Sequence, residues 1–98
     1  MSSTMTQDWS VDLTALCERL AERLGAEGYA HPLAAAVALA VRGRQGVDAD
    51  TFADELGIAP DELRRVESGL VPLHDFPGAL LLLADHTAGL DLDRLTAA

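Results

Sequence analysis

Three histidines and one cysteine are the side chains of this chain that most readily bind metals or attack substrates. His31, His74 and His86 lie far apart, without the short spacing that brings two ligands to one metal. Cys17 has no His or Lys beside it to stabilise a thiolate. The sequence contains no glycine-rich phosphate loop and no nucleophile next to a base, although such groups can also converge only in the fold. We therefore expect no metal site, no cofactor and no enzymatic activity.

Arginine is the other residue type with a clear chemical use. The chain has seven arginines and no lysine, and four of the arginines fall between positions 42 and 65: Arg42, Arg44, Arg64 and Arg65. A guanidinium group can donate two hydrogen bonds to one guanine or hold a phosphate. A simpler explanation is a solvated helix face on which an arginine pairs with an acid three or four residues away, for example with Asp61. Both explanations stay open.

Residues 48–69 follow a pattern that predicts two short helices joined by a tight turn. Asp48 is a suitable N-cap, because its carboxylate can accept from the unpaired amides of the first turn. Gly57 stands where a left-handed residue would end the first helix, Pro60 opens the second, and Gly69 closes it. Apolar and small residues recur at helical spacing and would form the packed side: Phe52, Ala53, Leu56, Ile58, Leu63 and Val66.

Over about residues 32–96 the chain resembles the phage repressor and Cro family of helix-turn-helix domains, also called the xenobiotic response element family. The residues that carry the resemblance are Ala53, Gly57, Ile58, Leu63, Val66, Glu67 and Gly69. The resemblance implies an all-α, five-helix domain. Its first helix would be Leu33 to Arg44, and its last two would be Phe76 to Thr87 and Leu92 to Leu95.

The resemblance also implies roles for individual residues. The positions that would read DNA are Pro60, Asp61, Arg64 and Arg65, with Arg44 near the docking face. Arg64 and Arg65 could contact guanine or phosphates, whereas Pro60 has no donor and Asp61 could accept only from an amino group of cytosine or adenine. Arg42 and Glu67 would form a structural ion pair between two helices.

Two departures from the family pattern weigh against DNA binding. The glutamine that commonly opens the first motif helix and holds a phosphate is replaced by Ala49. The loop after Gly69 reads LVPLHD and carries no arginine or lysine, where the family often has a basic loop. Asp61 and Glu62 can also be explained without a ligand, because acids in the first turn of a helix stabilise its dipole.

The chain divides into a disordered tail at 1–9, an N-terminal helix with its linker at 10–31, and the helix-turn-helix domain at 32–98. Ser10 would cap the N-terminal helix, which runs to about Leu24. Its apolar stripe consists of Leu13, Leu16, Cys17, Leu20 and Leu24. Gly25 and Gly28 would stop this helix, and Pro32 would start the next.

Two later segments are too apolar for helices with one buried face. The run LAAAVALAV needs a cover over Ala35, Ala38 and Leu39, either from the N-terminal helix or from a second subunit. Asp75 would cap the following helix, whose four consecutive leucines, 80 to 83, exceed one stripe. We expect a homodimer through this surface; coverage by the N-terminal helix of the same chain is the alternative.

Composition limits the location and the partner. The net charge of −9 comes from sixteen acids against seven arginines, and the acids are spread evenly along the chain. A single cysteine rules out an internal disulfide and fits a reducing cytoplasm. The most apolar run has nine residues, fewer than the roughly 20 of a membrane span. We expect a soluble, cytoplasmic protein without a membrane segment.

Two functions follow as hypotheses. The first is a dimeric, sequence-specific transcriptional regulator that binds double-stranded DNA through Arg44 and the Pro60 to Arg65 helix. The second is a degenerate helix-turn-helix module that acts as a protein-binding adaptor or accessory subunit without binding DNA. The fold and the grouped arginines favour the first hypothesis, and the net charge, the missing glutamine and the uncharged loop favour the second.

Overall fold

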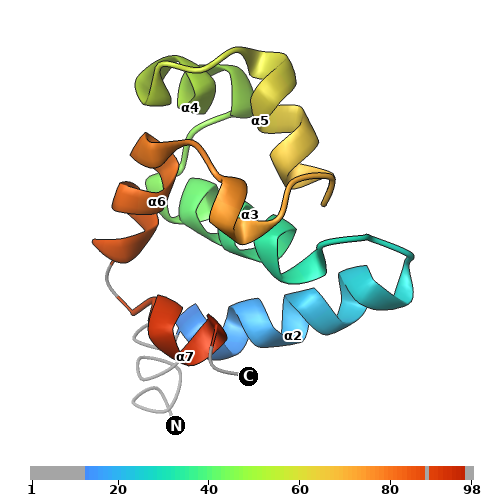
Figure 1. Ribbon diagram of the computed structural model, residues 1–98. Coiled ribbons are helices and arrows are strands. Elements are labelled where there is room, and N and C mark those ends of the chain that lie inside the picture. The colour runs from blue at the N-terminus through green and yellow to red at the C-terminus, as the bar shows by residue number, and fades with distance from the viewer. Residues whose placement is uncertain (1–12, 88, 97–98) are drawn as a thin grey trace, which may run out of the picture.

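A computed structural model of the chain describes residues 13–87 and 89–96, and this part folds entirely into helices and connecting loops (Figure 1). The all-α prediction is confirmed. The elements are α2 (Leu13–Ala26), α3 (Pro32–Gln45), α4 (Ala49–Leu56), α5 (Pro60–Glu67), the 3₁₀ turn η1 (Leu73–Asp75), α6 (Gly78–Asp85) and α7 (Leu92–Thr96). The predicted tail at 1–9 and the predicted cap Ser10 lie outside the described residues. None of the described helices is both long and apolar enough to cross a membrane.

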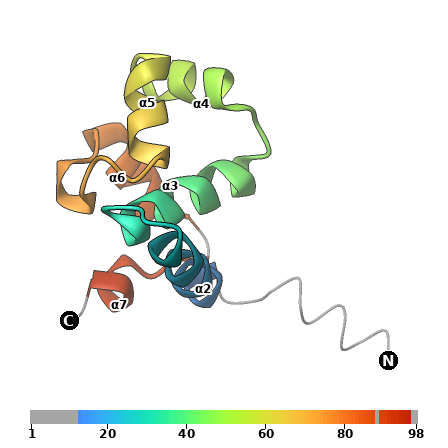
Figure 2. The ribbon, with the colours of Figure 1, turned by 90° about the vertical axis from the view of Figure 1, so that its right-hand side faces the viewer.

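Helix α3 is the centre of the molecule, with α2 on one side and the α4–α5 pair on the other (Figures 1 and 2). Its small apolar residues are buried all round: Ala34, Ala35, Ala36, Val37, Ala38 and Val41. Alanine side chains let neighbouring helices approach closely on several faces. The helix α2 of the same chain therefore covers the side of α3 that the sequence pattern left without a partner.

The apolar stripe of α2 is only partly buried. Leu13, Cys17 and Leu24 face α3 and are buried, whereas the Leu16 side chain is 45% exposed. Leu16 lies at the edge of the stripe because its helical position is rotated away from the line through Leu13, Cys17 and Leu24. Gly25 does not stop α2, which continues to Ala26 before the chain turns.

The α4–α5 pair forms as the local signals predict. The Asp48 carboxylate accepts a hydrogen bond from the Thr51 amide at 2.7 Å and so caps α4. Gly57 has φ of +72° and ends the helix in the left-handed conformation, and Pro60 opens α5. The fully buried Phe52, Leu63 and Val66 hold both helices against the rest of the core.

The helix predicted from Phe76 to Thr87 is shorter at both ends in the structure, where α6 runs from Gly78 to Asp85. Phe76 precedes Pro77, whose ring holds the preceding residue in an extended conformation, and Phe76 accordingly has ψ of 148°. Helix α6 therefore begins at Gly78, and Asp75 ends the 3₁₀ turn and does not cap α6.

Of the four leucines in α6, Leu80 is fully buried and Leu82 is 62% exposed. Helix α2 contacts α3 and α7, so the exposed part of α6 is not where α2 packs.

A buried threonine ties the two ends of the described chain together. The Thr14 hydroxyl donates to the Gly89 carbonyl at 3.1 Å and accepts from the Asp91 amide at 2.7 Å. These bonds fix the loop that leads into α7 on the first turn of α2, and the sequence pattern did not indicate them.

Candidate functional site

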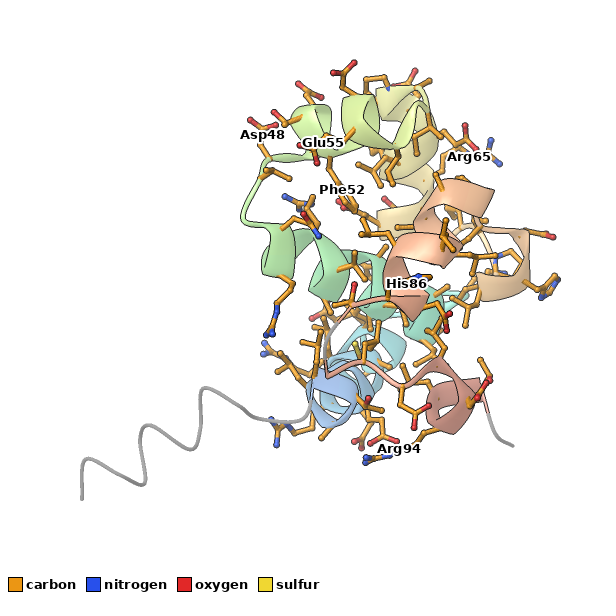
Figure 3. The ribbon with its side chains drawn as sticks, turned by 90° about the vertical axis from the view of Figure 1, so that its left-hand side faces the viewer. Asp48, Phe52, Glu55, Arg65, His86 and Arg94 are labelled. Carbon is orange, nitrogen blue, oxygen red and sulfur yellow. The ribbon has the colours of Figure 1, made fainter. Side chains whose placement is uncertain are left out.

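All four predicted base-reading residues lie at the surface of α5. Pro60 and Asp61 are exposed at its start, and Arg64 and Arg65 are exposed one turn later. Figure 3 shows Arg65 extending outward, whereas Phe52 of α4 points into the core. The first turn of α5 is therefore accessible to a partner of any kind.

Arg64 is engaged within its own helix. Its Nη1 atom lies 2.6 Å from Oδ1 of Asp61, three residues earlier, and the two side chains are 70% and 86% exposed. Such an exposed pair contributes about 0–1 kcal/mol, so a competing ligand can displace it. This is the solvated-face explanation considered for Arg64.

The surface of α4 and α5 is strongly acidic. Six carboxylates are exposed on this segment: Asp48, Asp50, Asp54, Glu55, Asp61 and Glu62. Hydrogen bonds from Thr51 hold the pKa of the Asp48 carboxyl below its usual range. Arg64 and Arg65 are the only exposed arginines on these two helices. The face that would approach DNA thus carries an excess of negative charge.

A hollow of about 420 Å³ lies between α5 and the loop before α6. Its charged lining residues are Asp61, Glu62, Asp75 and Arg65, and its apolar lining residues are Val66, Leu70, Val71, Pro72 and Pro77. Three carboxylates against one guanidinium group continue the acidic surface of α4 and α5. The loop thus adds carboxylate and apolar surface beside the start of α5.

Arg44 belongs to a different surface. It lines a groove of about 390 Å³ between α2 and α3, together with Leu13, Leu16, Leu20, Leu39, Ala40 and Gly43. Helix α2 and the α4–α5 pair lie on opposite sides of α3 (Figure 2). Arg44 therefore lines a hollow together with residues of α2. It does not line the hollow beside α5 that contains Arg65.

The α2–α3 groove, defined by these seven residues, is a surface that the sequence reasoning missed. Leu16 and Leu20 belong to the predicted apolar stripe, and their place at one edge of that stripe was the available signal. Arg19 and Arg23 stand on that same edge and line an adjoining hollow with Leu16 and Leu20. Two leucines and two arginines thus share one edge of α2. Helical periodicity places them on that edge, so the sequence could have indicated an apolar surface that is only partly buried.

Arg42 and Glu67 are placed as the family resemblance implies. The Arg42 Nε atom lies 2.8 Å from Oε2 of Glu67, and Arg42 Nη1 donates to the Val47 carbonyl at 3.3 Å. Their side chains are 28% and 13% exposed. This pair joins the end of α3 to the end of α5, and it removes Arg42 from the set of cations available to a ligand.

The groups considered for metal or nucleophilic chemistry are not assembled into a site. Within residues 13–87 and 89–96, no three His, Cys, Asp or Glu residues come close enough to hold a metal ion. Cys17 is fully buried, and its Sγ lies 3.8 Å from the Ala36 carbonyl oxygen.

Comparison of the chain with models of protein families, with curated proteins and with solved structures finds no match.

Proposed function

We propose that this chain is a repressor-like helix-turn-helix domain that acts as a non-enzymatic, protein-binding adaptor and does not bind DNA. The fold part of the proposal is supported by α4, the turn at Gly57 and α5, which pack as a unit on α3. In a helix-turn-helix domain of this type, the helix corresponding to α5 would enter the major groove.

The observation that carries the proposal is the charge of the α4–α5 surface. Duplex DNA carries about one negative charge per 1.7 Å of helix axis, and binding requires cations that replace its counterions. Six exposed carboxylates against two arginines make this surface negative, so it repels DNA. One of the two arginines, Arg64, also contacts Asp61. Acidic and apolar groups around the hollow beside α5 complement basic and apolar side chains of another protein better than they complement phosphates.

Binding to DNA is the second candidate because Arg64 and Arg65 are both exposed on α5. Arg65 is exposed and has no ion-pair partner among the described residues, and the Arg64–Asp61 pair is weak enough to be exchanged for a phosphate. A dimer would double this small set of cations. Even then, the salt dependence of binding should correspond to only about two to four released ions per subunit.

Selection from a random-sequence DNA pool at about 50 mM salt separates the two candidates, because weak electrostatic binding is strongest at low salt. The proposal predicts no enriched sequence and no retarded band. An enriched sequence whose binding falls with Arg64→Ala or Arg65→Ala would establish DNA reading and overturn the adaptor function.

A charge-neutralised variant tests whether acidity is what prevents DNA binding. Asp54→Asn, Asp61→Asn and Glu62→Gln together remove three exposed charges with little change in shape. If α5 is presented as in a helix-turn-helix domain, this variant should gain weak, salt-sensitive DNA binding that the unmodified chain lacks. Absence of any gain would contradict the assignment of α5 as a groove-entering helix.

Site-specific photocrosslinking tests the protein-binding half directly. A photoreactive residue in place of Leu70, which is 60% exposed beside the hollow, should give protease-sensitive adducts in cells that express the chain. These adducts should weaken when Asp61→Asn and Glu62→Gln are added. Nuclease-sensitive adducts would overturn the proposal, and the exposed position Asp93 on α7, which lines neither hollow, provides a matched control.

A further inference from the structure

The α2–α3 groove exposes apolar surface that the rest of the described chain leaves uncovered. Leu16 is 45% exposed, and Leu20 and Leu39 beside it are only partly buried. The walls are leucines of α2 and α3, and the polar member of the lining is Arg44. A contiguous apolar groove with a charged rim marks an interaction site more often than a single exposed leucine does.

Gly43 keeps the α3 side of the groove open. A Cβ atom added at this position would meet no heavy atom within 4 Å, so no described residue fills the space above it. The backbone of α3 is therefore accessible at Gly43.

The charge around the groove is opposite to that of the whole protein. Arg19 and Arg23 flank Leu16 and Leu20 on α2, and Arg44 lies on the α3 side. None of these three arginines forms an ion pair with another described residue, whereas Arg42, Arg64 and Arg94 each pair with an acid. In a chain of net charge −9, three uncommitted cations thus border one apolar groove.

We infer that the α2–α3 groove binds an amphipathic helix of a partner protein, with leucine-type residues on one stripe and Asp or Glu along its edges. The stripe would cover Leu16, Leu20 and Leu39, and the acids would pair with Arg19, Arg23 and Arg44. This is the helix-in-groove mode, read through anchors at i, i+3, i+4 and i+7. This groove shares no lining residue with the hollow beside α5, so the inference adds a second binding surface and goes beyond the proposed function.

A second copy of this chain fits the groove less well than an acidic partner. In a two-fold symmetric contact the same patch meets itself, so Arg19, Arg23 and Arg44 of one copy would face those of the other. Like charges brought together in this way oppose association. The charge of the rim therefore selects a different protein as the occupant.

Fluorescence anisotropy with labelled synthetic helices tests the inference on the full chain. The first peptide has about 18 residues, with leucines at i, i+3, i+4 and i+7 and glutamates on both edges; the second has lysines in place of the glutamates. The acidic peptide should bind at least about tenfold more tightly than the basic one. Its advantage should shrink between about 50 mM and about 500 mM salt. Equal affinity of the two peptides, or no binding of either, would overturn the inference.

Variants locate the binding and separate its two components. Leu16→Ser and the pair Arg19→Ala with Arg23→Ala alter exposed side chains and should each weaken the acidic peptide about tenfold or more. Leu82→Ser removes the most exposed leucine of α6 and is the matched control, which should leave the affinity unchanged. Loss of binding in Leu82→Ser with no effect of Leu16→Ser would place the site elsewhere.

Sedimentation of the full chain decides between a partner and a second copy. The inference predicts that Leu16→Ser leaves the oligomeric state unchanged. A dimer that Leu16→Ser dissociates would assign the groove to self-association and overturn the proposed occupant. A failure of peptide binding leaves the adaptor function to be judged by DNA selection and crosslinking at Leu70, so the two proposals fail independently.

Discussion

At the scale of single residues, the contact between Arg42 and Glu67 is the least exposed ion pair among the described residues. The pair lies at 2.8 Å, and Arg42 also donates to a backbone carbonyl. Side-chain exposures of 28% and 13% place it between a surface pair, worth up to about 1 kcal/mol, and a buried pair whose disruption costs about 3–5 kcal/mol. When one of the two side chains is replaced, water can partly solvate the charge that remains, which lowers the free-energy cost of leaving it unpaired.

We predict that Arg42→Met and Glu67→Leu each lower the free energy of unfolding by about 1–3 kcal/mol. The double variant should lose clearly less than the sum, because no uncompensated charge remains at the junction of α3 and α5. Urea denaturation of the three variants measures the coupling. Strictly additive losses would show that the two side chains do not stabilise each other.

The Asp48 cap predicts a dependence of stability on pH. The amide of Thr51 lowers the pKa of Asp48 in the folded chain below its ordinary value of 3.8. A carboxyl with a depressed pKa stabilises the fold above the unfolded pKa, and this contribution disappears as the pH falls through the folded pKa.

Thermal unfolding between about pH 5 and about pH 2 tests the cap. Asp48→Ala should lower the melting temperature at neutral pH and bring it closer to that of the unmodified chain in acid. Asp48→Asn keeps a cap acceptor without a titrating charge, so its stability should vary less over this range. A constant difference between Asp48→Ala and the unmodified chain at every pH would contradict this account.

At the scale of the elements, two glycines end helices of the α4–α5 pair in the same backbone conformation but in different surroundings. Gly57 has φ of +72°, and a Cβ added there would meet no heavy atom within 4 Å. Gly69 has φ of +77° and would place a Cβ 2.7 Å from the Tyr29 ring. The His31 amide also donates to the Gly69 carbonyl at 3.0 Å. Gly69 therefore controls how the end of α5 meets the loop between α2 and α3.

We predict that Gly57→Ala costs about 1–2 kcal/mol, the left-handed penalty of an L-residue. Gly69→Ala should lower the free energy of unfolding by more than Gly57→Ala does. The backbone penalty is the same, and the added Cβ also collides with the Tyr29 ring. Adding Tyr29→Ala to Gly69→Ala should recover the collision component only. Denaturant melts of equal cost for the two glycine variants would show that Tyr29 moves aside freely.

At the scale of the whole molecule, α2 completes the core by covering α3. Ala35 and Ala38 of α3 are fully buried. The contact between α2 and α3 is the most extensive contact between two helices in the described chain. The interface is formed within one chain, so the cover does not require a second subunit. Exposure of this surface would create an apolar patch large enough to cause association.

We predict that deletion of residues 1–27 produces aggregated or poorly folded protein. Removal of α2 uncovers the alanine-rich face of α3 and eliminates the Thr14 hydrogen bonds that hold the loop before α7. Size-exclusion chromatography and thermal melts provide the measurement. A soluble monomer that unfolds cooperatively after this deletion would show that α2 is dispensable for the core.

Local chemistry accounts for the features that residue order alone predicts. The cap at Asp48, the left-handed Gly57 and the start of α5 at Pro60 depend on neighbouring residues in the chain, and all three follow from residue type and spacing. The start of α6 also depends on a neighbour, because the Pro77 ring keeps Phe76 out of the helix. The prediction of a helix from Phe76 is wrong because it follows apolar spacing and ignores that ring.

Tertiary packing decided which side chains of the candidate sites lie together. We expected Arg44 near the same docking face as Arg64 and Arg65, yet Arg44 lines the α2–α3 groove. The direction of each side chain depends on how α2, α3 and α5 rotate against one another, and only the complete set of packing contacts fixes that rotation. The rotation of α2 against α3 also leaves Leu16 at the surface. Helical periodicity predicts an apolar stripe on α2, but it does not predict which edge of the stripe α3 covers.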